Sequence, residues 1–432
     1  MKNKGDIRCI YNDFSDRIIG NNALKRIDGK CIPFEPAESS EEYDFDAIVD
    51  RSGTNSLKYD FAQERGYPED ILPLWVADMD FMTAKPVVDA LRRTAEHGIF
   101  GYSNPKDDYY NAAASWFARN FGWLPEKKWL VKTPGVVFAL SMAVRAYTAP
   151  SDGVIIQTPV YYPFYSVIEN NGRKVIKNEL QYNGRHYEID FEDFENKIKE
   201  NNVKMFILCS PHNPTGRVWT KDELHRLGEI CLRYGVIVIS DEIHCDFTYS
   251  RHKHTIFSKA CPEMEDQSVI CTSPSKTFNI AGLQISNIWV SNPGLRQKMQ
   301  HEIDSCGYTE LNIFGITAAK TAYEKGEKWH IESWEYIRKN LDFVRSFIKR
   351  KIPQIKLVEP EGTYFAWLDC TGLGLNKEEL NDLIINKAGL WLDAGHIFGE
   401  SAEMFQRIVL ACPRKTLEQA LWKLEKAIKS YI

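Results

Sequence analysis

The stretch VICTSPSKTFNIAGLQISNIWV, residues 269–290, places one lysine, Lys276, between two apolar runs. The pattern predicts a strand, a tight corner built from Ser and Pro, a turn punctuated by Gly282, and a second strand. Lysine side chains mostly stay solvated, so a lysine at the corner between two predicted strands needs a specific reason. Lys276 is therefore the first candidate for a chemical role.

Compact apolar runs like the one before Lys276 recur upstream and alternate with helical patterns. The runs are GVIIQTP (153–159), KVIKNEL (174–180), KMFILCSP (204–211), GVIVISDE (235–242) and SVICTSP (268–274). The segments KPVVDALRRTAEHG (85–98) and VVFALSMAVRAY (136–147) carry the apolar spacing of helices. Short strands that are apolar on both faces and alternate with helices predict an α/β fold with a mostly parallel sheet covered by helices.

The chain divides into four parts by composition and pattern. Residues 1–42 hold few apolar residues and end in the acidic EPAESSEE, so we expect a loosely ordered extension. We expect residues 43–85 to form an N-terminal segment packed with the small domain, and residues 86–307 to form the large domain. Long amphipathic helices and the runs GTYFAWLDC (362–370) and FQRIVLACP (405–413) predict a smaller α/β domain over 308–432.

Charge and cysteine usage exclude several classes of function. The 432 residues carry a formal net charge of −5, without the basic footprint of a nucleic-acid-binding protein. No apolar run approaches the roughly 18 residues that a membrane helix needs. The ten cysteines form no CxxC pair, and the polar first residues give no secretory signal. We therefore expect a cytoplasmic protein with no nucleic-acid or membrane partner.

Polar residues follow four of the predicted strands. In parallel sheets, ligands bind at the carboxyl ends of the strands. Each polar residue also has a structural interpretation, because Asn-Pro and Ser-Pro sequences form turns and Asp caps helices. Their recurrence on successive strands favours a binding site. The residues are Tyr161 and Tyr162 after the first strand, Asn213, then Asp241 and His244, and finally Ser273, Ser275 and Lys276.

This set is chemically coherent if the ligand is pyridoxal 5′-phosphate. A lysine amine in a dry cleft forms a Schiff base with an aldehyde, and a buried carboxylate, here Asp241, keeps a pyridine nitrogen protonated. Asn213 suits the phenolate oxygen, and Tyr161 can stack on the ring. Predicted phosphate donors are Ser273, Ser275 and the helix start in TPGVVFAL, at Gly135, Val136 and Val137.

The motifs NPTG, SDEIH and SPSKTF resemble those of the fold-type I pyridoxal-phosphate enzymes in the class I/II aminotransferase superfamily. The resemblance covers roughly residues 43 to 430. It implies an aspartate-aminotransferase-like fold, whose large domain has a mostly parallel mixed sheet, with a smaller α/β C-terminal domain. It also implies that Lys276 binds the cofactor, that Arg407 grips the substrate carboxylate, and that Tyr102 reaches a phosphate across a homodimer interface.

Departures from the usual aminotransferase pattern point to one branch. Gln284 stands eight residues after Lys276, where aminotransferases commonly have arginine, and His244 stands where tyrosine is frequent. With PLWVADMDF (73–81), these features resemble the cystathionine β-lyase or C–S lyase branch of the MalY/PatB type. The resemblance implies cleavage of a Cβ–S bond to a thiol, pyruvate and ammonia. Lys276 and Tyr161 are the expected catalytic residues, and Ala77, Tyr162 and Arg407 are the expected substrate contacts.

Two other functions stay open at this stage. An aminotransferase would use almost the same residues but would require an amino acceptor. A regulatory protein with this fold would act through a protein partner and would keep lyase activity only as a secondary property. We predict no metal site, and we interpret YSRHKH (249–254) as an exposed turn although it adds two histidines near His244.

Overall fold

The computed structural model describes residues 23–27, 30–34, 42–249 and 251–431, which fall into two compact units, 1–41 and 42–432. In the first unit, β1 (Ala23–Ile27) and β2 (Lys30–Phe34) pair antiparallel, with Ala23 opposite Phe34. The prediction that residues 1–42 form a loosely ordered extension otherwise lies outside the described residues.

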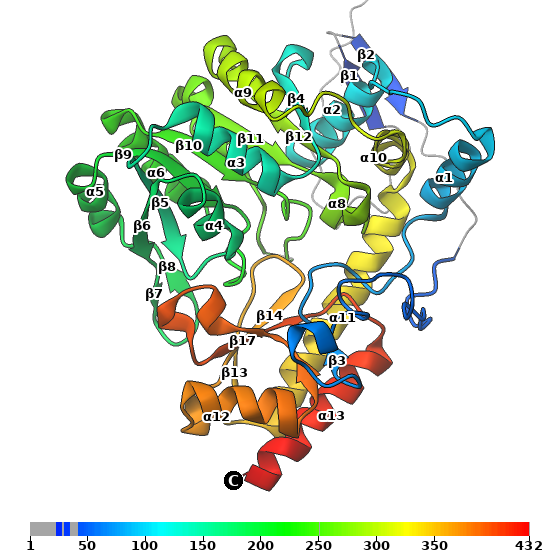
Figure 1. The fold of residues 1–432 in the computed structure, drawn as a ribbon, viewed down its shortest axis with the longest axis vertical. Helices are drawn as coiled ribbons and strands as arrows, with labels where there is room; N and C mark the ends of the chain where they lie inside the picture. The colour runs from blue at the N-terminus through cyan, green and yellow to red at the C-terminus, as the bar shows by residue number, and fades with distance from the viewer. Residues whose placement is uncertain (1–22, 28–29, 35–41, 250, 432) are drawn as a thin grey trace, which may run out of the picture. The chain divides into compact units, whose positions relative to one another are not determined.

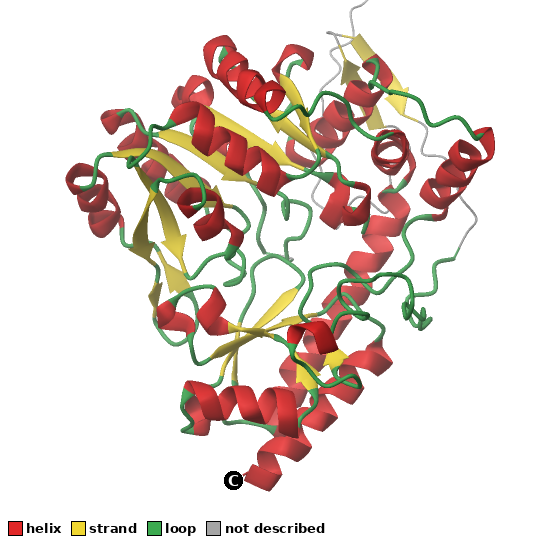
Figure 2. Ribbon diagram, viewed as in Figure 1, coloured by secondary structure: helices red, strands yellow, loops and turns green. Residues whose placement is uncertain are grey.

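A seven-stranded sheet forms the centre of the second unit, and it confirms the α/β prediction (Figures 1 and 2). Its strands are β4 (Leu130–Thr133), β5 (Gly153–Thr158), β6 (Lys174–Glu179), β9 (Val203–Cys209), β10 (Ile237–Asp241), β11 (Ser268–Thr272) and β12 (Ser286–Trp289). The spatial order is β4-β12-β11-β10-β9-β5-β6, in which β12 alone runs antiparallel to its neighbours. The sheet is therefore mixed and mostly parallel, as the sequence predicts.

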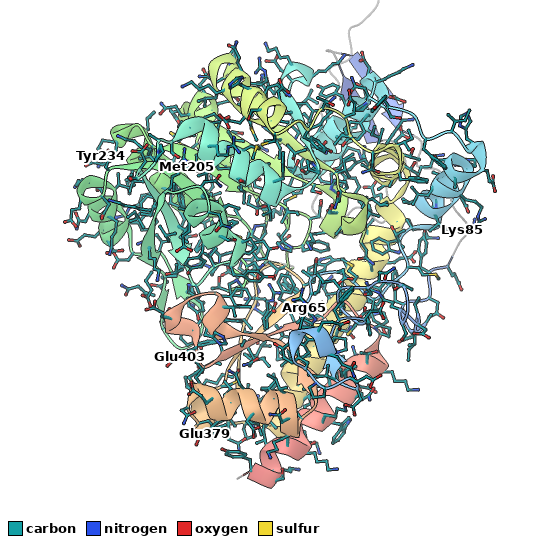
Figure 3. All side chains as sticks on the ribbon, in the orientation of Figure 1. Arg65, Lys85, Met205, Tyr234, Glu379 and Glu403 are labelled. Carbon is teal, nitrogen blue, oxygen red and sulfur yellow. The ribbon has the colours of Figure 1, made fainter. Side chains whose placement is uncertain are left out.

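Both faces of this sheet are buried, which explains why its strands are continuously apolar. Alternate residues of β9 join different cores: Phe206 packs on one face, and Met205 and Ile207 pack on the other. Side chains fill the space around the sheet, and Met205 lies among them (Figure 3). One face is covered by α3 (Val136–Tyr147), α4 (Pro163–Glu169) and α9 (Pro293–Ser305), and the other by α2 (Asp107–Phe121), α5 (Phe191–Glu200), α6 (Lys221–Tyr234) and α7 (Phe257–Ala260).

A smaller antiparallel sheet lies in the C-terminal part, in the order β13-β14-β17-β16. Its strands are β13 (Lys356–Val358), β14 (Phe365–Asp369), β16 (Asp393–Ala394) and β17 (Phe405–Val409). The helices of this part are α10 (Ile313–Lys325), α11 (Glu327–Lys351), α12 (Lys377–Asp382) and α13 (Arg414–Tyr431) (Figure 1). A parallel pair joins β3 (Leu72–Pro73), which precedes α1 (Lys85–His97), to β15 (Leu390–Trp391). The boundaries at residues 85 and 307 stay predictions.

Three further features of the described residues bear on the sequence analysis. All eight cysteines that can be assessed are free thiols, and seven of them are buried. No described helix combines the length and apolar character that crossing a membrane requires. The interpretation of 249–254 as an exposed turn is wrong at its end. His254 is buried because its Nε2 pairs with Glu242 Oε2 at 2.7 Å. This contact joins the loop to the end of β10.

Candidate active site

Side chains from both sheets meet at the carboxyl ends of the central strands. Asp241 is the last residue of β10, Asn213 follows β9, and Lys276 lies in the one-turn helix α8 (Pro274–Thr277) directly after β11. Arg407 projects from β17 of the small sheet, and its Nη1 donates to Asn213 Oδ1 at 2.7 Å. The predicted cofactor residues and the predicted substrate arginine therefore belong to one site.

The Ser-Pro corner of the opening stretch places Lys276. Ser273 caps α8, because its hydroxyl oxygen accepts from Ser275 N at 3.0 Å, and Pro274 supplies the fixed φ of a first helical residue. Lys276 Nζ donates to the carbonyl oxygen of Ala77 at 3.2 Å, which also accepts from the Tyr364 hydroxyl at 2.7 Å. Burial, aided by the charge of Arg407, lowers the pKa of Lys276 to about 8, although Asp78 and Asp241 oppose the shift.

Asp241 is a buried carboxyl with few partners of its own. Oδ1 accepts from the backbone N of Ile243 at 3.2 Å, and the side chain is almost inaccessible. Burial raises the pKa of Asp241 to about 7, and the charge of Glu242 adds to the shift. A nearby cation would restore the ionised form. This environment suits a carboxyl that must hold a protonated ring nitrogen.

His244 lies against two aromatic rings at the start of β14 in the small sheet. Its ring meets those of Tyr364 and Phe365 edge-on, with centroids 5.5 and 5.3 Å away. Burial, together with the positive charges of Lys276 and Arg407, lowers the pKa of His244 well below its usual value. The imidazole is therefore neutral. Its Nδ1 is buried and has no hydrogen-bond partner among the described residues.

Arg407 has a partner that the sequence analysis missed. Asp393 on β16 stands directly opposite Arg407 in the strand register and forms an ion pair with its Nη2, which also donates to Trp75 O at 3.0 Å. The guanidinium lies over the rings of Phe365 and Phe398, at 4.2 and 4.9 Å from their centroids. These contacts fix the plane of the guanidinium, which suits it to recognise a carboxylate.

The two tyrosines after β5 differ in accessibility. Tyr161 is held at the site through its backbone N, which donates to Asn213 O at 3.1 Å, and burial raises the pKa of its hydroxyl. Tyr162 is 40% exposed, with its ring centroid 5.3 Å from that of Tyr161. Tyr161 is therefore more deeply buried than Tyr162.

For the residues predicted to contact a phosphate, the structure shows their surroundings but not that contact. Gly135 caps α3, nothing lies within 4 Å of the position that a Cβ would take there, and the first N–H groups of a helix have no partner within the helix. The hydroxyls of Ser273 and Ser275 both donate to Ile285 O, at 2.7 and 3.4 Å. Their role toward a phosphate stays a prediction, as do those of Val136, which is buried, and Val137, which is partly exposed.

Two further residues from the sequence analysis lie apart from this group. Gln284 is exposed, and its φ of 50° falls in the left-handed region, at the end of the turn before β12. Tyr102 is 98% exposed and contacts none of the residues described above in this chain. Its predicted contact with a phosphate would require a second subunit.

A fully buried lysine, Lys58, lies in the segment before Ala77, whose carbonyl oxygen accepts from Lys276. Lys58 Nζ lies 2.8 Å from Asp80 Oδ2 and 3.3 Å from the Asp78 carbonyl oxygen. Arg51 bridges the two acids, with Nη1 at 3.0 Å from Asp80 Oδ1 and an ion pair to Asp78. These four charges support residues 78–80, next to Ala77, and the sequence analysis identified none of them.

The donor set fits pyridoxal phosphate. The site offers an amine with a lowered pKa, a buried carboxyl with a raised pKa, and an open helix start. It also contains two buried nitrogens, His244 Nδ1 and Arg407 Nε, that have no partner among the described residues. Buried polar atoms in native proteins usually have partners, so these nitrogens indicate a site built for a polar ligand.

Comparison with known proteins places the chain among enzymes of this type. The family model described as aminotransferase class I and II matches residues 69–424. Cystathionine beta-lyase PatB of Bacillus subtilis is 41% identical over 89% of this chain and 99% of its own length. Protein MalY of Escherichia coli is 33% identical over 90% of this chain and 99% of its own length.

Solved structures give the same picture. A PLP-bound putative aminotransferase from Clostridium difficile 630 is 42% identical with a TM-score of 0.87, covering 90% of this chain and 100% of that one. Cystalysin from Treponema denticola, which contains a pyridoxal 5′-phosphate cofactor, is 36% identical with a TM-score of 0.88, covering 91% of this chain and 100% of that one.

Proposed function

The chain belongs to the class I and II aminotransferase family, and from this premise we propose that it is a pyridoxal-phosphate-dependent C–S β-lyase. It cleaves the Cβ–S bond of cystathionine or a related cysteine S-conjugate by α,β-elimination, giving a thiol, pyruvate and ammonia. The names of its relatives support this branch. The observation that carries the proposal is Lys276, whose amine donates to Ala77 O and has a pKa lowered by burial, with Arg407 and Asp241 near enough to influence its charge.

Pyridoxal phosphate supplies an aldehyde for the amines and an electron sink for the substrate Cα. We assign Lys276 Nζ to the aldehyde, Asp241 to the ring nitrogen, Asn213 to the phenolate oxygen and Tyr161 to the ring face. His244, close to Lys276 and neutral, completes the pocket. We assign the phosphate to the N–H groups of Gly135, Val136 and Val137 and to the hydroxyls of Ser273 and Ser275.

The substrate is oriented by Arg407, whose guanidinium is already held in plane by Asp393 and two aromatic rings. With the α-carboxylate fixed there, the substrate amine and Cα face Lys276. Lys276 Nζ then takes the proton from Cα, a task for which a pKa near 8 is well matched at neutral pH. Tyr161 and Tyr162 flank the leaving sulfur, and the Ala77 carbonyl oxygen holds the amine in position.

The assembly is a cytoplasmic homodimer with shared sites. Tyr102 is almost fully exposed, and Ile99 and Phe100 beside it are 74% and 60% exposed, an apolar group that a second copy would bury. Mixing inactive Lys276→Ala protein with inactive Tyr102→Ala protein tests this. Exchange of subunits creates sites with both native residues, so activity should return. A mixture that stays inactive after verified subunit exchange would contradict a shared site.

The deciding experiment incubates purified holoenzyme with cystathionine and no keto acid. A lyase releases pyruvate and a free thiol in equal amounts. The solved relative named as a putative aminotransferase favours a second candidate, which would convert its amino donor only after a keto acid is added and would release no ammonia. That second result would replace the lyase assignment.

A further inference from the structure

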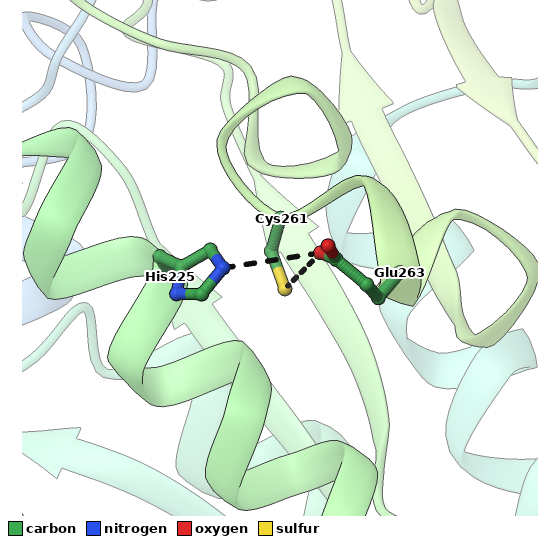
Figure 4. Close-up of side chains that lie close together, drawn as sticks. All are labelled: His225, Cys261 and Glu263. Atoms are coloured by element: carbon green, nitrogen blue, oxygen red, sulfur yellow. Dashed lines mark hydrogen bonds and ion pairs between the residues drawn. The ribbon is translucent and has the colours of Figure 1, made fainter.

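Three side chains of kinds that bind metals lie close together among the helices that cover the seven-stranded sheet. His225 lies on α6, Cys261 follows the last residue of α7, and Glu263 lies in the 3-10 helix at Pro262–Gln267 (Figure 4). Their ligand atoms all lie within 4.8 Å of one another, the one such group among the described residues. None of their described contacts involves Lys276, Asp241 or Arg407, so this cluster is separate from the active site.

The distances approach those of a coordination shell. Glu263 Oε2 lies 3.9 Å from His225 Nε2 and 3.7 Å from Cys261 Sγ. In a tetrahedron with the bond lengths of zinc, neighbouring ligand atoms lie about 3.3–3.5 Å apart. The Glu263 side chain is 59% exposed, so its rotation can shorten its own two distances, and the His225 and Cys261 ligand atoms lie within 4.8 Å of each other.

Gly228 allows the Cys261 sulfur to lie close to α6. A Cβ on Gly228 of α6 would come within 2.5 Å of Cys261 Sγ, so only glycine allows the thiol to lie this close to the helix. The thiol is buried, whereas His225 is 40% exposed and opens to solvent. The arrangement therefore combines one fixed ligand with two adjustable ones at the surface.

A fourth residue, Glu229, lies on the other side of the imidazole from Glu263. Glu229, one turn after His225 on α6, has its Oε2 3.7 Å from His225 Nδ1, while Nε2 faces Glu263. Metal-binding histidines commonly donate their second nitrogen to a carboxylate, which fixes the tautomer with the opposite nitrogen free to coordinate. Glu229 therefore stands where such a positioning carboxylate is expected.

We propose that His225, Cys261 and Glu263 form a binding site for a divalent cation of the zinc class, with water completing the coordination shell. Sulfur, imidazole nitrogen and carboxylate oxygen are the three ligand types that Zn²⁺ accepts, whereas Mg²⁺ and Ca²⁺ require oxygen ligands. Binding forms a Zn–S bond and releases the thiol proton to solvent. The site requires no redox partner.

The local charge supports a cation. The carboxylates of Glu263 and Glu229 lie 3.9 and 3.7 Å from the two nitrogens of the His225 imidazole. Bound metal would join α6 to the turn after α7, and the folded state would gain stability through ligand binding.

Titration of the metal-free-dialysed holoenzyme with Zn²⁺ tests the proposal. We expect one ion per chain, and a rise in Tm of about 3 °C at roughly 100-fold excess over Kd. His225→Ala and Glu263→Gln should each weaken binding by about 100-fold or more, and Glu229→Gln by about tenfold. The ligands His225 and Glu263 are partly exposed, so these variants should fold, and their Tm without metal checks this.

Matched controls lie on another helix. His301, on α9, is exposed, and Cys306, directly after that helix, is the exposed cysteine of the described part of the chain. His301→Ala and Cys306→Ser should bind Zn²⁺ with unchanged Kd. The proposal is overturned if His225→Ala and Glu263→Gln bind as tightly as the native protein, or if no site has a Kd below about 10 μM.

Discussion

Among the described residues, Lys58 is fully buried and Lys276 is partly buried, and their surroundings give these two lysines opposite properties. Lys58 is 1% exposed and lies 2.8 Å from the Asp80 carboxylate, within a cluster that also contains Arg51 and Asp78. Lys276 donates to a neutral carbonyl oxygen of Ala77, and no carboxylate lies within ion-pair distance of it among the described residues. The first lysine is a paired structural cation, and the second is an amine with a pKa near 8.

The difference shows that burial alone does not make a lysine reactive. Burial disfavours the charged form, and a carboxylate at contact distance reverses that effect. At Lys276 the acids Asp78 and Asp241 act from farther away and only partly oppose the desolvation. The distance to the nearest carboxylate, which differs by a few ångströms, thus decides which lysine is structural and which is reactive. Four changes test this contrast, from the largest expected effect to the smallest.

Replacing Lys276 by Ala should reduce pyruvate release from cystathionine by about 10⁴-fold or more, because the base that takes the Cα proton is removed. The Lys276→Ala protein should also lose the absorbance of cofactor bound through its amine. Lys298→Ala, at an exposed position of α9, serves as the control and should keep full activity. Substantial activity in Lys276→Ala would assign the proton transfer to another group.

Replacing Asp241 by Asn should lower the turnover rate by about 100-fold, because a neutral amide cannot hold a ring nitrogen protonated. The same change should stabilise the cofactor-free protein more at pH 8 than at pH 5. The sign follows from the pKa, which burial raises to about 7 in the folded protein. The stability of the native protein therefore falls as pH rises from the ordinary carboxyl pKa of 3.8 to about 7 and changes little above that, whereas Asn does not ionise. Equal stability differences at both pH values would refute the raised pKa.

Replacing Lys58 by Met should cost about 3 kcal/mol of unfolding free energy, because Asp80 stays buried with one cation fewer. Turnover per folded molecule should change little, since Lys58 touches no reacting group. Lys276→Met is the matched comparison and should leave the Tm of the cofactor-free protein unchanged or higher. If Lys58→Met lost activity but not stability, the assignment of this cluster to structure would be wrong.

How far the sequence predicts the site depends on whether a residue's partners are local. Lys276, Asp241 and Asn213 follow apolar strands, so strand order and the rule for parallel sheets bring them together. Asp393 was missed because its pairing with Arg407 depends on the register of β16 against β17, which short strands leave weakly marked in the sequence.

The missed charge clusters have the same cause. Lys58 and Asp80 are joined by an irregular segment whose path no periodicity describes. His225 and Cys261 lie 36 residues apart, and their proximity depends on a glycine, Gly228, whose packing role has no local pattern. The fold itself was predictable because alternation of short strands and helices is a repeated signal, whereas these contacts each occur once.

The smallest effect concerns pH, and it follows from Lys276 alone. A neutral amine attacks an aldehyde and an ammonium does not, so the rate at which cofactor-free protein captures pyridoxal phosphate depends on the neutral fraction of Lys276. Burial lowers the pKa of this group to about 8. The capture rate should therefore rise about tenfold per pH unit below 8 and level off above it.

The control for this pH profile is the model reaction of the same aldehyde with a free alkylamine, whose rate should keep rising to about pH 10.4, the ordinary pKa of lysine. Stopped-flow absorbance at fixed ionic strength measures both rates. A protein profile that follows the free amine up to that pH would mean that the pKa of Lys276 is not lowered, and the contrast between the two lysines would fail. A midpoint shifted upward in a variant with a new acid beside Lys276, such as Ala77→Asp, would instead show that carboxylate distance sets the difference.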